Sequence, residues 1–200
     1  MESKYFVDLN IDATNALRSD LDLEDFKNTV NTNDPVKSWT LMGESLYDVY
    51  DKEWLNYIDS VAGKIIGSLI FWRASNYFDD KLHIDLKPDP LEVAKWGLNF
   101  GIDGNDNSEM IWYEPYAEEF LSGGNTKFTT NGSPYSVWSV EEFEGYEATR
   151  KIIGQNLVLI NTSIPHTIQT YNNERWGFSL RTADMASDWE DAILKFKKIY

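Results

Sequence analysis

The chain has 200 residues and carries 33 acidic side chains against 18 lysines and arginines, so its net charge at pH 7 is −15. It contains two histidines, His83 and His166, and no cysteine. The absence of cysteine excludes disulfides, thiolate metal sites and cysteine nucleophiles. The acidic balance argues against nucleic acid as a partner, because that affinity depends on basic side chains. No apolar run approaches the ~20 residues of a membrane helix, and no signal peptide is recognisable. We therefore expect a cytoplasmic protein without a nucleic-acid or membrane partner.

The first 63 residues are expected to be mainly helical and to support a β-sheet core. Apolar residues at helical spacing predict a helix near 23–30, with Asp20 or Asp22 as its cap. A longer apolar stripe predicts a second helix over about Gly43–Ala62. The composition shows no linker or repeat that would divide residues 1–200, so we expect a single domain.

After Gly63 the pattern changes to short runs that are rich in β-branched and aromatic residues and are separated by turn residues. The predicted strands are Lys64–Arg73, Lys81–Asp85, Glu92–Ile102, Glu109–Tyr113, Ser136–Ser139, Leu157–Asn161, His166–Thr170 and Arg175–Thr182. A last helix is predicted over Ser187–Lys198. Helices, then about eight strands, then a helix indicate a mainly β protein: a sandwich or barrel with helices outside one sheet.

Two of the predicted strands alternate between bulky apolar residues and small or polar ones. In residues 96–102 the second set is Gly97, Asn99 and Gly101; in residues 175–181 it is Arg175, Gly177, Ser179 and Arg181. Because side chains in a strand alternate between its faces, each set shares one face. That face either lies in water or lines a cavity, where glycines leave room for a ligand and an arginine pairs with an anion.

The histidines suggest a metal site. His83 and Asp85 are two residues apart in an extended segment and therefore point the same way, and His166 opens a later strand. Two imidazoles and one carboxylate form the facial set that leaves three positions of an octahedral ion open. Arg175, nine residues after His166, could form a bidentate pair with the carboxylate of a co-substrate. Alternatively, His83 is a surface residue at a strand end and His166 is hydrogen-bonded in a turn.

These motifs resemble the Fe(II)/2-oxoglutarate-dependent oxygenase superfamily. The resemblance covers about residues 64–182 and is greatest to phage and bacterial hydroxylases related to aspartyl/asparaginyl β-hydroxylases and prolyl hydroxylases. The segments that carry it are His83-Ile84-Asp85, Gly97-Leu98-Asn99-Phe100, Met110-Ile111-Trp112-Tyr113, Pro165-His166 and Arg175 with Ser179-Leu180-Arg181. It implies a jelly-roll or cupin-like core, a double-stranded β-helix over residues 64–182, braced by residues 1–63 and by a C-terminal helix in 183–200.

The resemblance also implies a set of site residues. Fe(II) would be held by His83, Asp85 and His166, and the distal carboxylate of 2-oxoglutarate by Arg175. Arg181 lies on the same face and is a rival for that carboxylate. Beside these, Ser179 and Asn99 are candidates for contact with the co-substrate, and Arg73, Trp112 and Tyr113 are candidates for the substrate pocket. For Asn99, Trp112 and Tyr113, simple packing is the alternative. Because eighty residues (86–165) separate Asp85 from His166, we expect an insertion within Glu114–Arg150.

The expected function is hydroxylation of a small molecule, an amino acid or a peptide side chain. The alternative is a sandwich without redox activity that binds carbohydrate or another small ligand through its 8 Trp, 11 Tyr and 10 Phe. A cupin-like isomerase or dioxygenase with another metal is a third interpretation, although such sites usually use three or more histidines. The sequence leaves the substrate and the oligomeric state open.

Overall fold

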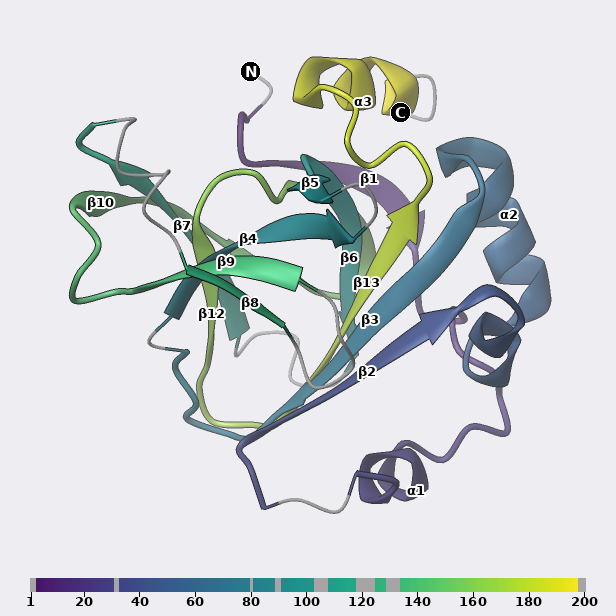
Figure 1. The fold of residues 1–200 in the computed structure, drawn as a ribbon. Helices are drawn as coiled ribbons and strands as arrows, with labels where there is room; N and C mark the ends of the chain where they lie inside the picture. The colour runs from purple at the N-terminus through teal and green to yellow at the C-terminus, as the bar shows by residue number, and fades with distance from the viewer. Residues whose placement is uncertain are drawn as a thin grey trace.

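The computed structural model describes residues 3–30, 33–79, 81–88, 91–102, 108–117, 125–128 and 134–197. The strands form two sheets (Figure 1). Within each sheet, all the described neighbouring strands pair in the antiparallel direction. The first sheet has six strands in the order β1 (Phe6–Asp12), β11 (Asn156–Asn161), β6 (Trp96–Ile102), β13 (Arg175–Thr182), β3 (Ile65–Arg73) and β2 (Val36–Met42).

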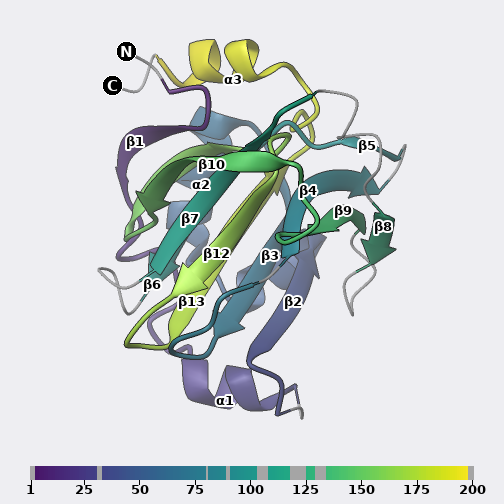
Figure 2. The same cartoon turned by 90° about the vertical axis from the view of Figure 1, so that its left-hand side faces the viewer.

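The second sheet has seven strands. Six follow the order β10 (Gly145–Ile152), β7 (Ser108–Pro115), β12 (His166–Thr170), β4 (Lys81–Pro88), β9 (Pro134–Ser139) and β8 (Asn125–Phe128), and β5 (Leu91–Val93) pairs with β4. Figure 2 shows the face of this sheet, with β7 and β12 side by side.

The chain passes between the two sheets repeatedly. It runs from β3 in the first sheet to β4 in the second, returns to β6, crosses to β7, and later alternates from β10 through β11 and β12 to β13. The central order is therefore β3-β13-β6-β11 in one sheet and β4-β12-β7-β10 in the other. Eight antiparallel strands wound alternately into two facing sheets make a jelly roll. The predicted double-stranded β-helix, cupin-like fold is confirmed.

The helices cover the outer face of the first sheet. They are α1 (Leu23–Asn28), the 3₁₀ helix η1 (Gly43–Asp48), α2 (Lys52–Ala62) and α3 (Trp189–Phe196). The bulky residues of β6 and β13 share one buried apolar core with residues of α2 and α3, including Leu55, Ile58 and Phe196. Burial of apolar area drives this packing, and it turns the opposite, small-residue face of β6 and β13 toward the second sheet. None of the described helices has the length and apolar character to cross a membrane.

The N-terminal third is less helical than predicted. It contains β1 and β2, which form the two edges of the first sheet. The helix expected over 43–62 is interrupted: η1 ends at Asp48, Tyr50 forms a β-bridge with Leu17, and the carboxylate of Asp51 caps α2 by accepting from the Trp54 amide at 2.9 Å. At α1 the predicted cap is present, because Asp22 accepts from the first-turn amides of Glu24 and Asp25.

The predicted strand over 92–102 is divided between the two sheets. Its first residues belong to β5, which pairs with β4, and the rest forms β6 in the first sheet. Within Glu114–Arg150, where an insertion is expected, the structure has β8, β9 and most of β10, all in the second sheet. Residues 118–124 and 129–133 of this segment lie outside the described residues.

Candidate metal centre and anion pocket

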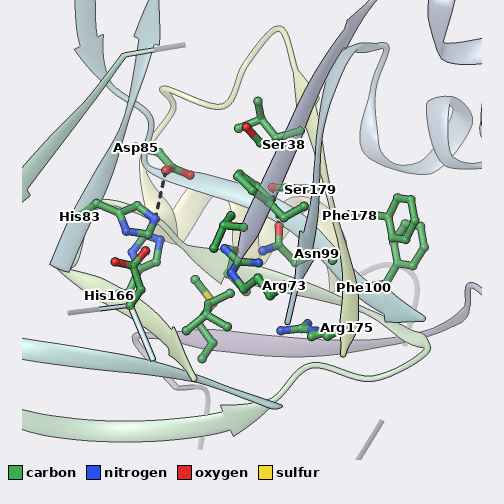
Figure 3. A pocket seen from close by; sticks show the side chains of 18 of the residues that line it. Ser38, Arg73, His83, Asp85, Asn99, Phe100, His166, Arg175, Phe178 and Ser179 are labelled. Atoms are coloured by element: carbon green, nitrogen blue, oxygen red, sulfur yellow. Dashed lines mark hydrogen bonds and ion pairs between the residues drawn. The ribbon is translucent and has the colours of Figure 1, made fainter. Parts of the chain in front are cut away.

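A cavity of about 340 Å³ lies between the two sheets and is lined from both of them (Figure 3). It brings together eight of the residues expected at the site: Arg73, His83, Asp85, Asn99, His166, Arg175, Ser179 and Arg181. The small-residue faces of β6 and β13 therefore line a cavity and do not lie in water. This was one of the two interpretations of their alternation. A volume of this size is at the lower end of the range for small-ligand sites, which is roughly 300–1,000 Å³.

Two of the expected pocket residues lie elsewhere. Trp112 is fully buried in a second apolar cluster with Met110 and Ile168, and its indole N–H donates to the Asn161 carbonyl at 3.0 Å. Tyr113 packs edge-on against Phe143, with ring centroids 6.3 Å apart. Neither is among the residues that line the cavity.

Three potential metal ligands converge at one end of the cavity. His83 and Asp85 project from β4, and His166 is the cross-strand neighbour of His83 on β12. One ligand atom from each of the three lies within 4.8 Å of the others, and His83 Nε2 is 3.9 Å from Asp85 Oδ1. Metal bonds to imidazole and carboxylate are about 2.0–2.2 Å long, so one divalent ion can contact all three residues after small side-chain adjustments.

The two histidines are held in the neutral form that binds metals. His166 Nδ1 lies 2.9 Å from the Ile164 carbonyl, an acceptor that assigns the proton to Nδ1 and leaves the lone pair on Nε2. Burial, reinforced by the neighbouring His83, lowers the pKa of His166 to about 3. Burial also lowers the pKa of His83, although the negative charge of Asp85 opposes this. Metal binding therefore does not compete with a proton on either ring at neutral pH.

Asp85 is held as a carboxylate. Burial would raise its pKa, but the charge of Arg181, with further contributions from the two imidazole rings and from the Arg181 hydrogen bond, outweighs burial and brings the pKa to about 2. Arg181 Nη2 donates to Asp85 Oδ2, while the other oxygen, Oδ1, faces His83. The guanidinium of Arg181 is thus already paired with the Asp85 carboxylate through Nη2, whereas its Nη1 lacks a hydrogen-bond partner.

Arg175 is placed differently. Its side chain is buried, Nη2 donates to the Ile153 carbonyl at 3.2 Å, and both Nε and Nη1 lack a hydrogen-bond partner. Burial, with a smaller contribution from Arg73, lowers its pKa. Buried donors without partners are costly, and an anion in the cavity would satisfy them. The unpartnered donors of Arg175 could therefore pair with a carboxylate group in the cavity.

Glycine supplies the space for Arg175. A Cβ on Gly101 would stand 3.0 Å from Arg175 Nη2 and 2.8 Å from the Ile153 carbonyl oxygen. Gly97 has the same relation to Arg181, whose Nη1 would lie 2.8 Å from an added Cβ. The small residues predicted to leave room for a ligand thus leave room for the two arginines themselves.

Asn99 and Ser179 are cross-strand neighbours, and Ser179 Oγ donates to Asn99 Oδ1 at 2.6 Å.

The sequence interpretation missed other lining residues: Ser38 of β2, Tyr77 and Asp79 between β3 and β4, and Lys81 at the start of β4. Ser38 was missed because strand β2 was not predicted. The adjacent Trp39 is buried on the opposite face of β2, so this strand also alternates.

Comparisons with known proteins give distant similarities of structure and none of sequence. No protein-family model matches the chain, and no curated protein does. A point mutant of oxalate decarboxylase OxdC from Bacillus subtilis is 8% identical with a TM-score of 0.37; the alignment covers 76% of this chain and 27% of that one. HygX from Streptomyces hygroscopicus, with nickel and 2-oxoglutarate bound, is 11% identical with a TM-score of 0.39 and coverages of 83% and 82%.

An oxidoreductase of the 2OG-Fe(II) oxygenase family from Burkholderia pseudomallei is 12% identical with a TM-score of 0.32, over 88% of this chain and 63% of that one. The alignments span less than a third of the length of OxdC and of procruciferin, an 11S globulin from Brassica napus that this chain also matches. At these identities and TM-scores the neighbours do not assign an activity to this chain.

Proposed function

We propose that the protein is an iron(II)- and 2-oxoglutarate-dependent oxygenase that hydroxylates a C–H bond of a small molecule, an amino acid or a peptide side chain. One observation carries the proposal: two neutral histidines and an aspartate carboxylate share one cavity with a buried arginine that has unpartnered donors. When bound, iron(II) and 2-oxoglutarate supply the oxidation, in which O₂ is reduced while 2-oxoglutarate loses CO₂ to become succinate.

The ligand residues are prepared for this role by their neighbours. The carbonyl of Ile164 orients the His166 ring, and Arg181 fixes one oxygen of Asp85, which leaves Oδ1 toward the histidines. Partners of this kind hold metal ligands in place, and their loss typically costs about 10–100-fold in metal affinity. We assign Arg181 to this positioning role and not to the co-substrate.

Arg175 is assigned to the distal carboxylate of 2-oxoglutarate. It is deeply buried, faces no carboxylate within salt-bridge distance among the described residues, and has donors left for a charge-assisted pair. Ser179 and Asn99 lie on the same faces of β13 and β6 and supply polar groups beside the co-substrate. The apolar lining, which includes Leu69, Met110 and Ile168, limits water around the reacting atoms.

The alternative of an aromatic sugar-binding surface has less support. The buried hydrophobic residues include Trp39, Trp96, Trp112, Trp138, Trp176 and Trp189. Tryptophans that are packed in the cores have no open ring face on which a sugar could stack, and none of the residues that line the cavity is a tryptophan.

The decisive experiment is an anaerobic titration of the metal-free protein with Fe(II) and 2-oxoglutarate. We expect a weak visible charge-transfer band from the chelate, and succinate after O₂ is admitted. His166→Gln should abolish both signals, whereas Asp184→Asn, which removes a carboxylate paired with Lys195 outside the cavity, should retain both. If the wild-type protein gives neither band nor succinate, the proposed function is wrong.

A further inference from the structure

A second buried arginine, Arg73, enters the same cavity. It is the last residue of β3 and the cross-strand neighbour of Arg175 on β13. Its side chain is almost fully buried, its Nε lacks a hydrogen-bond partner, and its guanidinium carbon lies 4.7 Å from the centroid of the Phe71 ring. Figure 3 shows it pointing into the cavity with Arg175 and the histidines.

The two guanidinium groups share a small space. Measured from the position that a Cβ of Gly177 would occupy, Arg73 Nη1 is 3.6 Å away and Arg175 Cζ is 3.9 Å away. Two like charges that share a buried space repel each other when no anion lies between them. Burial lowers the pKa of both arginines, and the charge of Arg73 lowers that of Arg175 further.

The charges around the cavity exceed what one co-substrate neutralises. The cationic residues that line it are Arg73, Lys81, Arg175 and Arg181, whereas the carboxylates are Asp79 and Asp85. The lining is therefore positive in a chain whose net charge is −15. A divalent metal would add two positive charges, and 2-oxoglutarate with its two carboxylates would balance only those two.

We infer that Arg73 binds an acidic group of the primary substrate, a carboxylate, phosphate or sulfonate, beside the 2-oxoglutarate held by Arg175. This inference rests on the proposed function and names the substrate class: a small anionic molecule. A guanidinium has five N–H donors, and Arg175 spends one on the Ile153 carbonyl. Arg175 can therefore hold one carboxylate by itself, which leaves Arg73 for another anion.

Asp79 offers a different explanation for Arg73. Its negative charge raises the pKa of Arg73 against the effect of burial, so the arginine could be a structural partner of this carboxylate. The two explanations make opposite predictions for Asp79→Asn. If Arg73 is a ligand for an external anion, removal of the Asp79 charge keeps or strengthens anion binding. If Arg73 is structural, that variant behaves like Arg73→Gln.

The test uses the full chain with Mn(II), which binds such ligand sets without oxidative turnover, and saturating 2-oxoglutarate. Acetate and methylphosphonate are then added as probes, with sodium chloride as the control for ionic strength, and thermal unfolding reports binding because a ligand of the folded state raises Tm. We expect a second rise in Tm with at least one probe. Arg73→Gln should weaken probe binding at least 10-fold and change 2-oxoglutarate affinity less than 3-fold.

Two variants make the result specific. Arg175→Gln should weaken 2-oxoglutarate binding far more than Arg73→Gln does, and Arg18→Gln, which removes an arginine paired with Asp20 on the surface, should retain both responses. The inference is overturned if the wild-type protein shows no second rise, if Asp79→Asn loses probe binding as Arg73→Gln does, or if Arg73→Gln weakens 2-oxoglutarate as much as Arg175→Gln. A probe response that depends on Arg73 without any response to Mn(II) and 2-oxoglutarate would keep the anion site and refute the oxygenase.

Discussion

Gly101→Ala tests whether the Arg175 side chain needs the space that the missing side chain of Gly101 leaves. Gly101 lies on β6 and faces the cavity, and its amide donates to the Gly154 carbonyl at 2.8 Å. A methyl group there would lie 2.8 Å from the Ile153 carbonyl oxygen and 3.0 and 3.1 Å from Nη2 and Nε of Arg175. The arginine side chain can move away. The Ile153 carbonyl cannot move as easily, because the next residue, Gly154, is hydrogen-bonded to the Gly101 amide of β6.

Overpacking of this kind costs about 1–3 kcal/mol. For a chain of this length each kcal/mol lowers Tm by roughly 2–4 °C, so we expect a fall of roughly 2–12 °C. Displacement of Arg175 would also remove a charge-assisted hydrogen bond worth about 1.5–3 kcal/mol. At about 1.4 kcal/mol per factor of ten, 2-oxoglutarate affinity should fall by roughly 10–150-fold.

Gly177→Ala is the matched control, because it also adds a methyl group on the cavity face of a central strand. Its nearest neighbours would lie at 3.6, 3.9 and 4.0 Å, which is ordinary contact. Its Tm should equal or slightly exceed that of the wild-type protein, since replacing glycine restricts the unfolded chain by about 0.4–1 kcal/mol. Thermal unfolding and titration calorimetry with Mn(II) and 2-oxoglutarate measure both effects. Equal Tm and equal affinity in the two variants would refute the reasoning.

Three further predictions concern the charged residues of the cavity. His166→Gln should weaken Mn(II) binding by more than about 100-fold in calorimetry, because it removes a ligand and not merely a supporting partner; unchanged affinity would place the metal elsewhere. Arg175→Gln should raise the 2-oxoglutarate requirement by about 10–100-fold and leave metal affinity nearly intact. Arg181→Gln should lower metal affinity by about 10–100-fold, because Arg181 holds Asp85 in place. The reverse pattern would exchange the two assignments. Arg73→Met should stabilise the ligand-free protein at pH 7 by about 0.5–2 kcal/mol in urea unfolding. A base whose pKa is lowered by folding destabilises the folded state while it is protonated, and an arginine is protonated at pH 7. A loss of stability would show that Arg73 is a structural charge.

Short runs of β-branched and aromatic residues predicted most of the strands that carry the site, and alternation predicted the faces of β6 and β13. The bounds of β12 and β13 agree with the prediction at both ends, and the apolar residues of β6 and β13 lie on the helix side as expected. Period-2 alternation is a property of neighbouring residues, and one face of β6 and of β13 is apolar, so their orientation could be predicted without tertiary information.

The edge strands were not predictable in this way. β1 contains Asn10 at a positive φ of 53°, and its register with β11 shifts between Asp8 and Asp12, which breaks simple alternation. β10 exposes residues on both faces, and it is held by backbone pairing with β7. These strands exist because a partner far away in the chain offers free backbone donors and acceptors, which no local pattern encodes.

The sequence by itself determined which residues can hold a metal through imidazole, because the chain has only His83 and His166 and no cysteine. It also determined that Arg175 and Arg181 share a face, because a strand repeats every two residues. Only the tertiary structure decided their roles. The order β3-β13-β6 sets Arg73 beside Arg175, and the facing of the two sheets pairs Arg181 with Asp85. A side chain's direction is a local property, whereas its charge partners depend on which distant strands become neighbours.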